Sequence, residues 1–180
     1  MSGKSDKRIA TPVHPSKTIH FQKYYAKLPT HQFIEYVGER RCLRIFLDFR
    51  ADISHSKKKN ILNTFFELLP HYALHARIIY IGMIFKPKHK DDLTCNDDRR
   101  RILENVVKQL NDVDKPSYAE IHLALHLDYL AFDQITPASA IHGLNSQSWT
   151  LAILTDDVQH IERGSKIDRM LKDRFDKGIF

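Results

Sequence analysis

The chain has 180 residues, of which 42% are hydrophobic and 28% are charged, and its net charge is +6. This length suits one domain and this composition is that of a globular protein, which excludes a fibrous or wholly disordered chain. The two cysteines, Cys42 and Cys95, fit neither a zinc motif nor a disulfide framework, no stretch is apolar enough to span a membrane, and no secretory signal opens the chain, so we expect a cytoplasmic protein.

Most of the positive charge lies at the N-terminus. Residues 1–30 carry a net charge of +5, and the remaining residues carry +1. Residues 1–17 include Pro12 and Pro15 and show no hydrophobic periodicity, which predicts a flexible basic arm before a single α/β domain at 18–180. Such an arm can bind phosphates and release counterions, although a tail that only aids solubility is the alternative reading.

The first half of the domain predicts alternating strands and helices. A hairpin beginning near residue 32 leads into a strand at 42–49, where apolar residues recur with period two. Apolar residues at helical spacing predict a helix that begins near Ser54 and stops at Pro70. The apolar run 77–85 suits a strand buried on both faces beside the first strand, and a helix with a solvated polar face follows at 96–110.

The second half is less regular. Residues 116–132 combine a helix-like start with strand-like alternation, so both readings stay open. We expect a loop at 133–148, a short strand at 149–154 and a closing helix at 158–175. This order predicts a three-layer α/β domain with a mainly parallel sheet, at whose edge an antiparallel N-terminal hairpin can pair.

Carboxylates stand where two of these strands end. Asp48 lies at the end of the strand 42–49, and Asp156 and Asp157 follow the strand 149–154. In an open α/β sheet, ligands bind beyond the carboxyl ends of the strands. If the two strands are parallel neighbours, the acids converge and need a cation, for which Mg²⁺ or Mn²⁺ is the usual choice. Such a metal can activate water against a phosphodiester.

The segments 43–48, 121–128 and 151–157 resemble the three sequence motifs that carry the acidic residues of PIN and NYN-type ribonucleases. The resemblance spans about residues 42 to 175. It implies an α/β fold with a parallel sheet and metal-dependent cleavage of RNA, with Asp48, Asp128 and Asp157 as the catalytic, metal-binding acids. The chain departs from the family pattern at Phe49 and Arg50, where Gly and Asn are usual, and at His122 and Gln159, where acids are usual.

A second polar cluster comprises Glu120, His122, His126 and Asp128. In a strand all four side chains project to one side, and in a helix the two histidines share a face. Glu120, His122 and His126 therefore form an alternative metal site, or the polar side of a small-molecule pocket. An exposed polar face without chemistry is the alternative reading.

Phosphate contacts are predicted at lysines in two groups, Lys57, Lys58 and Lys59 at a helix start and Lys86, Lys88 and Lys90 after a strand. Cations are unfavourable at a helix start, so a partner would explain the first group. The leading hypothesis is a metal-dependent nuclease-like domain acting on RNA. The alternative is a non-catalytic binding module that engages nucleic acid or an acidic protein, without contact to a membrane.

Overall fold

The computed structural model describes residues 23–50, 55–85, 94–113, 120–127, 131–146 and 148–178. The basic arm expected at 1–17 lies outside these residues. No helix in the described ranges is long and apolar enough to cross a membrane.

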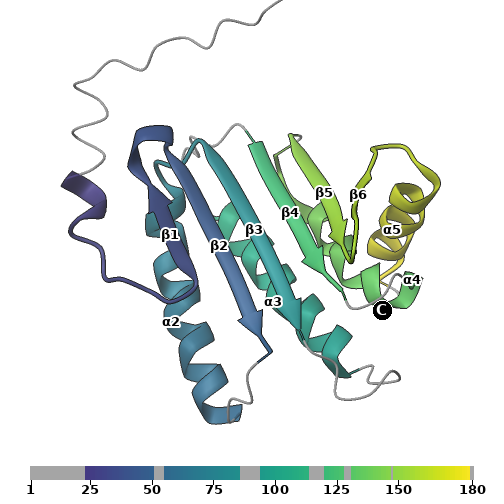
Figure 1. Cartoon of the computed structure of the whole chain (residues 1–180), viewed down its shortest axis with the longest axis horizontal. Helices are drawn as coiled ribbons and strands as arrows, with labels where there is room; N and C mark the ends of the chain where they lie inside the picture. Colours follow the sequence, from purple (N-terminus) through teal and green to yellow (C-terminus); the bar gives the residue numbers. More distant parts are fainter. Residues whose placement is uncertain are drawn as a thin grey trace, which may run out of the picture.

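A six-stranded sheet forms the centre of the domain, and its strands follow one another across the sheet in chain order (Figure 1). The strands are β1 (Ile34–Val37), β2 (Cys42–Phe49), β3 (Ile78–Phe85), β4 (Glu120–His126), β5 (Trp149–Leu154) and β6 (Val158–Ile161). Neighbours from β2 to β5 are parallel, whereas β1 and β6 pair antiparallel at the two edges. The α/β class, the mainly parallel sheet and the antiparallel N-terminal hairpin are confirmed.

The helices that connect the parallel strands lie behind the sheet in the view of Figure 1. The helical elements are η1 (Gly38–Arg40), α2 (His55–Ala73), α3 (Thr94–Asn111), α4 (Phe132–Ile135), η2 (Thr136–Gly143) and α5 (Lys166–Lys177). Right-handed crossovers between strands in sequential order place every connection on the same face of the sheet. The described elements therefore form two layers, and the third layer that we expected is not among them.

Side-chain burial follows this asymmetry along each strand. In β2, Leu43 and Leu47 are fully buried against the helices, whereas Phe46 between them is 45% exposed. In β3, Ile79 is fully buried and its neighbour Tyr80 is 44% exposed. The prediction that residues 77–85 are buried on both faces is therefore wrong, because no described helix covers the second face.

Three predicted boundaries also need correction. Helix α2 runs past Pro70 to Ala73, because the carbonyl of Pro70 still accepts a hydrogen bond from the Leu74 amide at 3.0 Å and Ala73 is fully buried. The expected loop 133–148 instead contains α4 and η2, whose small residues pack into the core. The expected helix 158–175 begins only at Lys166, since residues 158–161 pair with β5 as β6.

The polar face predicted for the second helix is only partly solvated. Arg99 on α3 is 1% exposed. Its guanidinium donates to Oε1 of Gln134 at 3.0 Å and to Oδ1 of Asn96 at 3.3 Å. Since Gln134 belongs to α4, this buried group ties α3 to the segment that the sequence predicted to be a loop.

Candidate functional site

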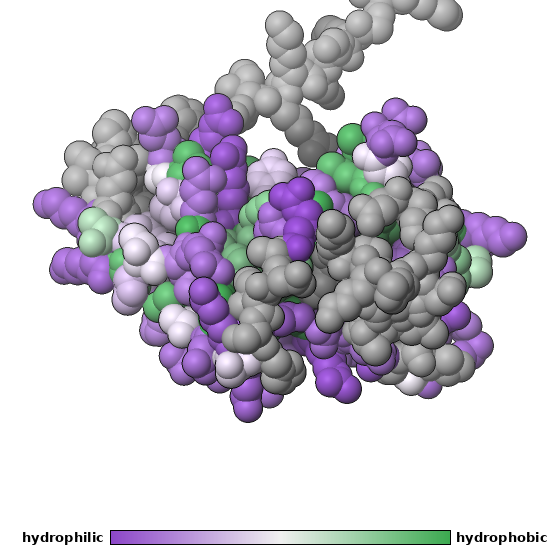
Figure 2. All heavy atoms as spheres, turned by 60° about the horizontal axis from the view of Figure 1, so that its bottom comes forward, coloured by the Kyte–Doolittle hydropathy of each residue, from purple (hydrophilic) through white to green (hydrophobic). Residues whose placement is uncertain are grey.

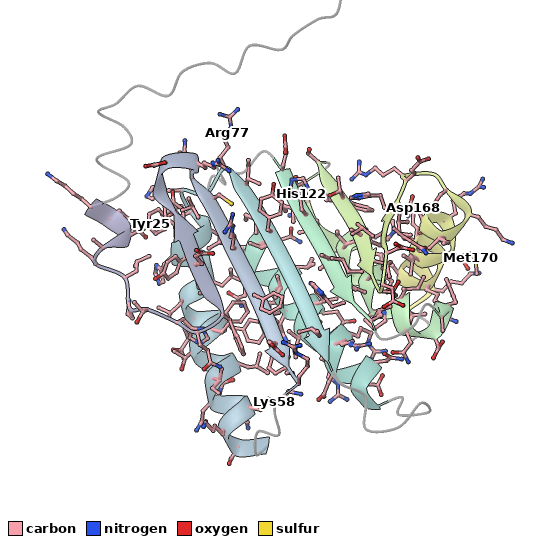
Figure 3. All side chains as sticks on the ribbon, viewed as in Figure 1. Tyr25, Lys58, Arg77, His122, Asp168 and Met170 are labelled. Carbon is pink, nitrogen blue, oxygen red and sulfur yellow. The ribbon has the colours of Figure 1, made fainter. Side chains whose placement is uncertain are left out.

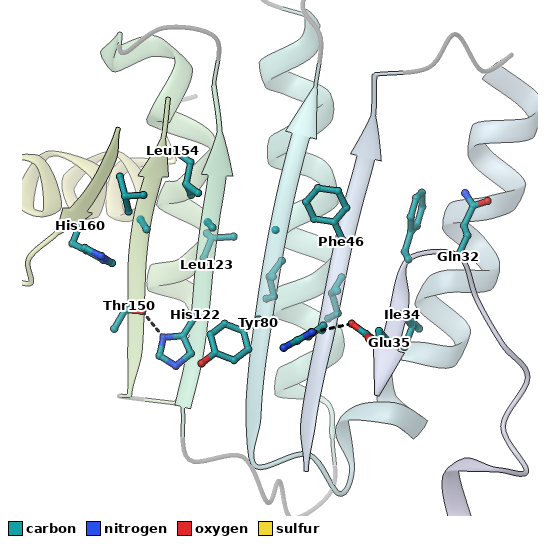
Figure 4. Close-up of a pocket in the computed structure, with 18 residues that line it drawn as sticks. Gln32, Ile34, Glu35, Phe46, Tyr80, His122, Leu123, Thr150, Leu154 and His160 are labelled. Atoms are coloured by element: carbon teal, nitrogen blue, oxygen red, sulfur yellow. Dashed lines mark hydrogen bonds and ion pairs between the residues drawn. The ribbon is translucent and has the colours of Figure 1, made fainter. Parts of the chain in front are cut away.

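The face of the sheet opposite the helices is hollowed. Parallel strands usually have both faces covered, but none of the described elements covers this one, which we call the uncovered face. The hollow has a volume of about 570 Å³ and is lined by outward-facing side chains from β1 to β6 (Figure 4). Ligand pockets commonly have volumes of this order.

Small residues form the floor of the hollow. The strand register places Gly82, Ala124 and Ala152 opposite one another on β3, β4 and β5, and we call these three the small row. Phe46 on β2 closes one end of the row and His160 on β6 the other. The Phe46 ring lies over Gly82, where an added Cβ would stand 2.8 Å from its Cδ2 atom. The row therefore needs glycine at position 82.

A second register row borders the floor toward the amino ends of the strands. This polar row consists of Glu35, Arg44, Tyr80, His122 and Thr150. The rings of Tyr80 and His122 stack with centroids 4.6 Å apart and planes 16° apart. The guanidinium of Arg44 lies 3.3 Å from the Glu35 carboxylate, which raises the pKa of Arg44 and keeps it charged.

His122 is held on both ring nitrogens. Its Nδ1 lies 2.7 Å from the Thr150 hydroxyl, and its Nε2 lies 3.4 Å from a carboxylate oxygen of Glu120. Together with the stack on Tyr80, these contacts fix the plane of the ring. The imidazole is thus positioned in the hollow rather than free to rotate.

The alternative metal cluster is only partly assembled. Residues 120–126 form a strand, which settles the open choice between strand and helix in this range, and Glu120, His122 and His126 all lie on the uncovered face. However, His122 and His126 are about 13 Å apart along the strand, too far to bind one ion. His126 instead packs edge-on against Phe46. Burial lowers the pKa of His126, and Arg50 lowers it further.

The acids of the predicted nuclease site are placed at separate points. Asp48 is the penultimate residue of β2 and forms a bidentate ion pair with Arg50, whose shortest contact is 2.7 Å. This hydrogen bonding holds the pKa of Asp48 below its usual range. Asp157 is exposed in the turn between β5 and β6. Since β3 and β4 lie between β2 and β5, the two strands are about 14 Å apart.

The third acid, Asp128, lies outside the described residues. Within the described part of the chain, no group of three or more His, Cys, Asp or Glu side chains is placed to hold a metal ion. Figure 2 turns the carboxyl ends of the strands forward and shows mainly hydrophilic side chains with small hydrophobic patches between them. Binding of Mg²⁺ or Mn²⁺ by Asp48, Asp128 and Asp157 stays a prediction.

The predicted lysines that the structure describes lie away from the polar row. Figure 3 shows Lys58 at the bottom of α2 and His122 toward the opposite end of the sheet. Lys57 and Lys59 are exposed there, whereas Lys58 pairs with Asp98 at 2.6 Å and lies over the Phe49 ring. The other group, Lys86, Lys88 and Lys90, falls outside the described residues.

Phe46 and Tyr80 are among the site residues that sequence reasoning missed, as are Thr150 and His160. Phe46 and Tyr80 occur in strands whose alternate positions are fully buried, which made them look like further core residues. The sequence signal that could have identified them is the type of residue at the neighbouring alternate positions of the same strands. On the same side of their strands stand Arg44, Asp48 and Gly82, which are not core residues.

Comparison of the chain with protein-family models, with curated proteins and with solved structures finds no match.

Proposed function

We propose that the uncovered sheet face binds single-stranded nucleic acid, with RNA as the expected ligand. The observation that carries this proposal is the exposure of two aromatic rings on neighbouring strands, Phe46 at 45% and Tyr80 at 44%. Nucleobases stack on such rings whatever their sequence, because every base has a flat π face. Sheets that present aromatic side chains in this way commonly stack two or three bases of RNA.

The direction of the hollow favours a strand of nucleic acid over a helix from a protein partner. Helices packed on a sheet run along its strands, as α2 and α3 do on the covered face (Figure 1). A helix in that direction on the uncovered face would have to cross the stacked pair of Tyr80 and His122. The small row instead runs across the strands from β3 to β5 between flanking side chains.

The charge of the chain also suits a polyanionic ligand. The net charge is +6, and most of it belongs to residues 1–30. On the described face, Arg44 stands beside Tyr80 in the polar row with its side chain 53% exposed. A base stacked on Tyr80 would bring its phosphate within reach of this guanidinium.

Fluorescence anisotropy of labelled oligonucleotides tests the proposal. Unstructured RNA and DNA strands should bind, and the affinity should fall as salt rises, because cationic contacts to phosphates release counterions. A duplex of the same sequence is the matched competitor, since its bases are already stacked and cannot lie on Phe46 and Tyr80. Equal binding of strand and duplex, or no binding of either, would refute stacking on this face.

Metal-dependent cleavage of RNA and a cytoplasmic location stay predictions. A thermal melt with and without Mn²⁺ tests the former, because a metal that binds only the folded state raises the midpoint. A shift that is lost in both Asp48→Asn and Asp157→Asn would place these acids in one site.

A further inference from the structure

The polar row contains an arrangement for proton transfer that stacking alone does not require. His122 Nδ1 contacts the Thr150 hydroxyl at 2.7 Å, and Nε2 contacts Glu120 Oε2 at 3.4 Å. When both nitrogens of His122 carry protons, both of these oxygens can accept from the ring. The 3.4 Å contact is long for a charged hydrogen bond, so a substrate oxygen can take the place of the carboxylate at Nε2.

A second histidine lines the same hollow. His160 on β6 is exposed and lies opposite Ala152, which is two residues beyond the partner of His122 on β5. Two strand spacings and this offset put the Cα atoms of His122 and His160 about 12 Å apart. Figure 4 shows both side chains on the uncovered face, on the two strands that flank β5. Two imidazoles at this separation can stand on either side of one phosphodiester.

We propose that this face cleaves bound RNA by transfer to the neighbouring 2′-hydroxyl, with His160 as general base and His122 as general acid. This activity depends on the RNA binding proposed above. His160 takes the proton of the 2′-hydroxyl, whose oxygen attacks the adjacent phosphorus. The O2′–P bond forms, the P–O5′ bond breaks, and His122 gives the proton on Nε2 to the departing 5′ oxygen. The products are a 2′,3′-cyclic phosphate and a 5′-hydroxyl, and the step consumes no water and needs no metal ion.

Thr150 and Glu120 are positioning residues in this scheme. The hydroxyl of Thr150 fixes the ring through Nδ1, and the carboxylate of Glu120 lies on the side from which the proton is delivered. Serine in place of Thr150 keeps the hydroxyl, whereas valine removes it with little change in size. Thr150→Ser should therefore retain cleavage and its dependence on pH, whereas Thr150→Val should slow cleavage and shift the basic limb of the pH profile, which reports the general acid.

The experiment measures binding and cleavage separately. Binding is measured with a 2′-O-methyl strand, which cannot react, and cleavage with the unmodified RNA of the same sequence, both in EDTA. Loss of a general acid or base typically costs about 10²- to 10⁴-fold in rate. We expect this loss of rate at saturating RNA in His122→Ala and in His160→Ala, well beyond any change in affinity for the 2′-O-methyl strand, and a cyclic phosphate among the products of the parent.

The control variant is His71→Ala, which removes an exposed histidine from α2 in the helical layer and should cleave at the parental rate. Thermal melts of each variant confirm that it is folded. Binding without cleavage would overturn the acid–base assignment and leave the proposed binding function intact. No binding of the 2′-O-methyl strand would overturn both proposals. Cleavage that is unchanged in both histidine variants would overturn the assignment, because other residues or a contaminating nuclease would then be its source.

Discussion

Replacing the two exposed rings tests how the uncovered face binds its ligand. Stacking of a base on an aromatic side chain contributes about 1–3 kcal/mol. Phe46→Ala and Tyr80→Ala should therefore each weaken the affinity for a short unstructured RNA by roughly 5- to 150-fold, since 1.4 kcal/mol corresponds to a factor of ten. Tyr80→Phe keeps the ring and should bind nearly as the parent does.

The same substitutions should leave the domain folded. Full burial of a large apolar side chain contributes about 1.5–3 kcal/mol. Since Phe46 and Tyr80 are 45% and 44% exposed, each substitution should lower the free energy of unfolding by only about 1 kcal/mol, against about 5–15 kcal/mol for a typical domain.

Anisotropy at one salt concentration gives the affinities, and urea denaturation gives the stabilities. Met170→Ala is the matched control, because Met170 is a large apolar side chain of α5 that is 40% exposed and does not line the hollow. If the double variant of Phe46 and Tyr80 binds RNA as tightly as the parent, the stacking argument is refuted.

Three further predictions follow from particular contacts. Gly82→Ala should displace the Phe46 ring, whose Cδ2 would lie 2.8 Å from the new Cβ, and should therefore weaken RNA binding. Ala124→Gly adds no atom to the floor of the hollow and should bind RNA as the parent does. Equal affinities of the two variants would contradict the requirement for glycine at position 82. Gln134→Leu should lower the free energy of unfolding by about 1.5–3 kcal/mol, because buried Arg99 loses an acceptor at 3.0 Å. Urea denaturation measures this free energy, and an unchanged value would show that Arg99 does not depend on the Gln134 acceptor. Stability should fall as the pH drops through the range in which histidine titrates, because burial lowers the folded-state pKa of three histidines and the unfolded chain therefore takes up protons first. Urea denaturation at several pH values checks this, and a stability that rises on acidification through this range would contradict it. These histidines are His31, His126 and His142.

Local patterns predicted β2, β3 and β5 closely, but they left β4 open between strand and helix and assigned β6 to a helix. The arrangement of the layers could not be predicted from them. The strands 42–49 and 149–154 were predicted with the bounds that the structure has, because alternating or continuous apolar runs were bounded by turn residues. The same patterns do not tell which strands are neighbours. The sequential order places all described crossovers on one face, and only this order reveals that no described element covers the second face.

The candidate site was predicted only in part, because local patterns show which residues share a face of one strand but not which strands are neighbours. The face shared by Glu120, His122 and His126 followed from the period of two residues, and the structure bears it out. The convergence of Asp48 and Asp157 required their strands to be neighbours, which they are not. The contact of His122 with Thr150 joins residues 28 positions apart and arises from register alone, which no local pattern reports.

An NMR titration tests the central claim most directly. Isotope-labelled protein is titrated with an unstructured 2′-O-methyl RNA strand, and the shifted backbone amides are mapped onto the structure. We predict that the largest changes occur in β2, β3, β4 and β5, at Phe46, Tyr80, Gly82, His122 and Thr150, with small changes in the outer faces of α2 and α3. Changes centred on those helices, or no changes at all, would contradict the account of the uncovered sheet face as a nucleic-acid binding surface.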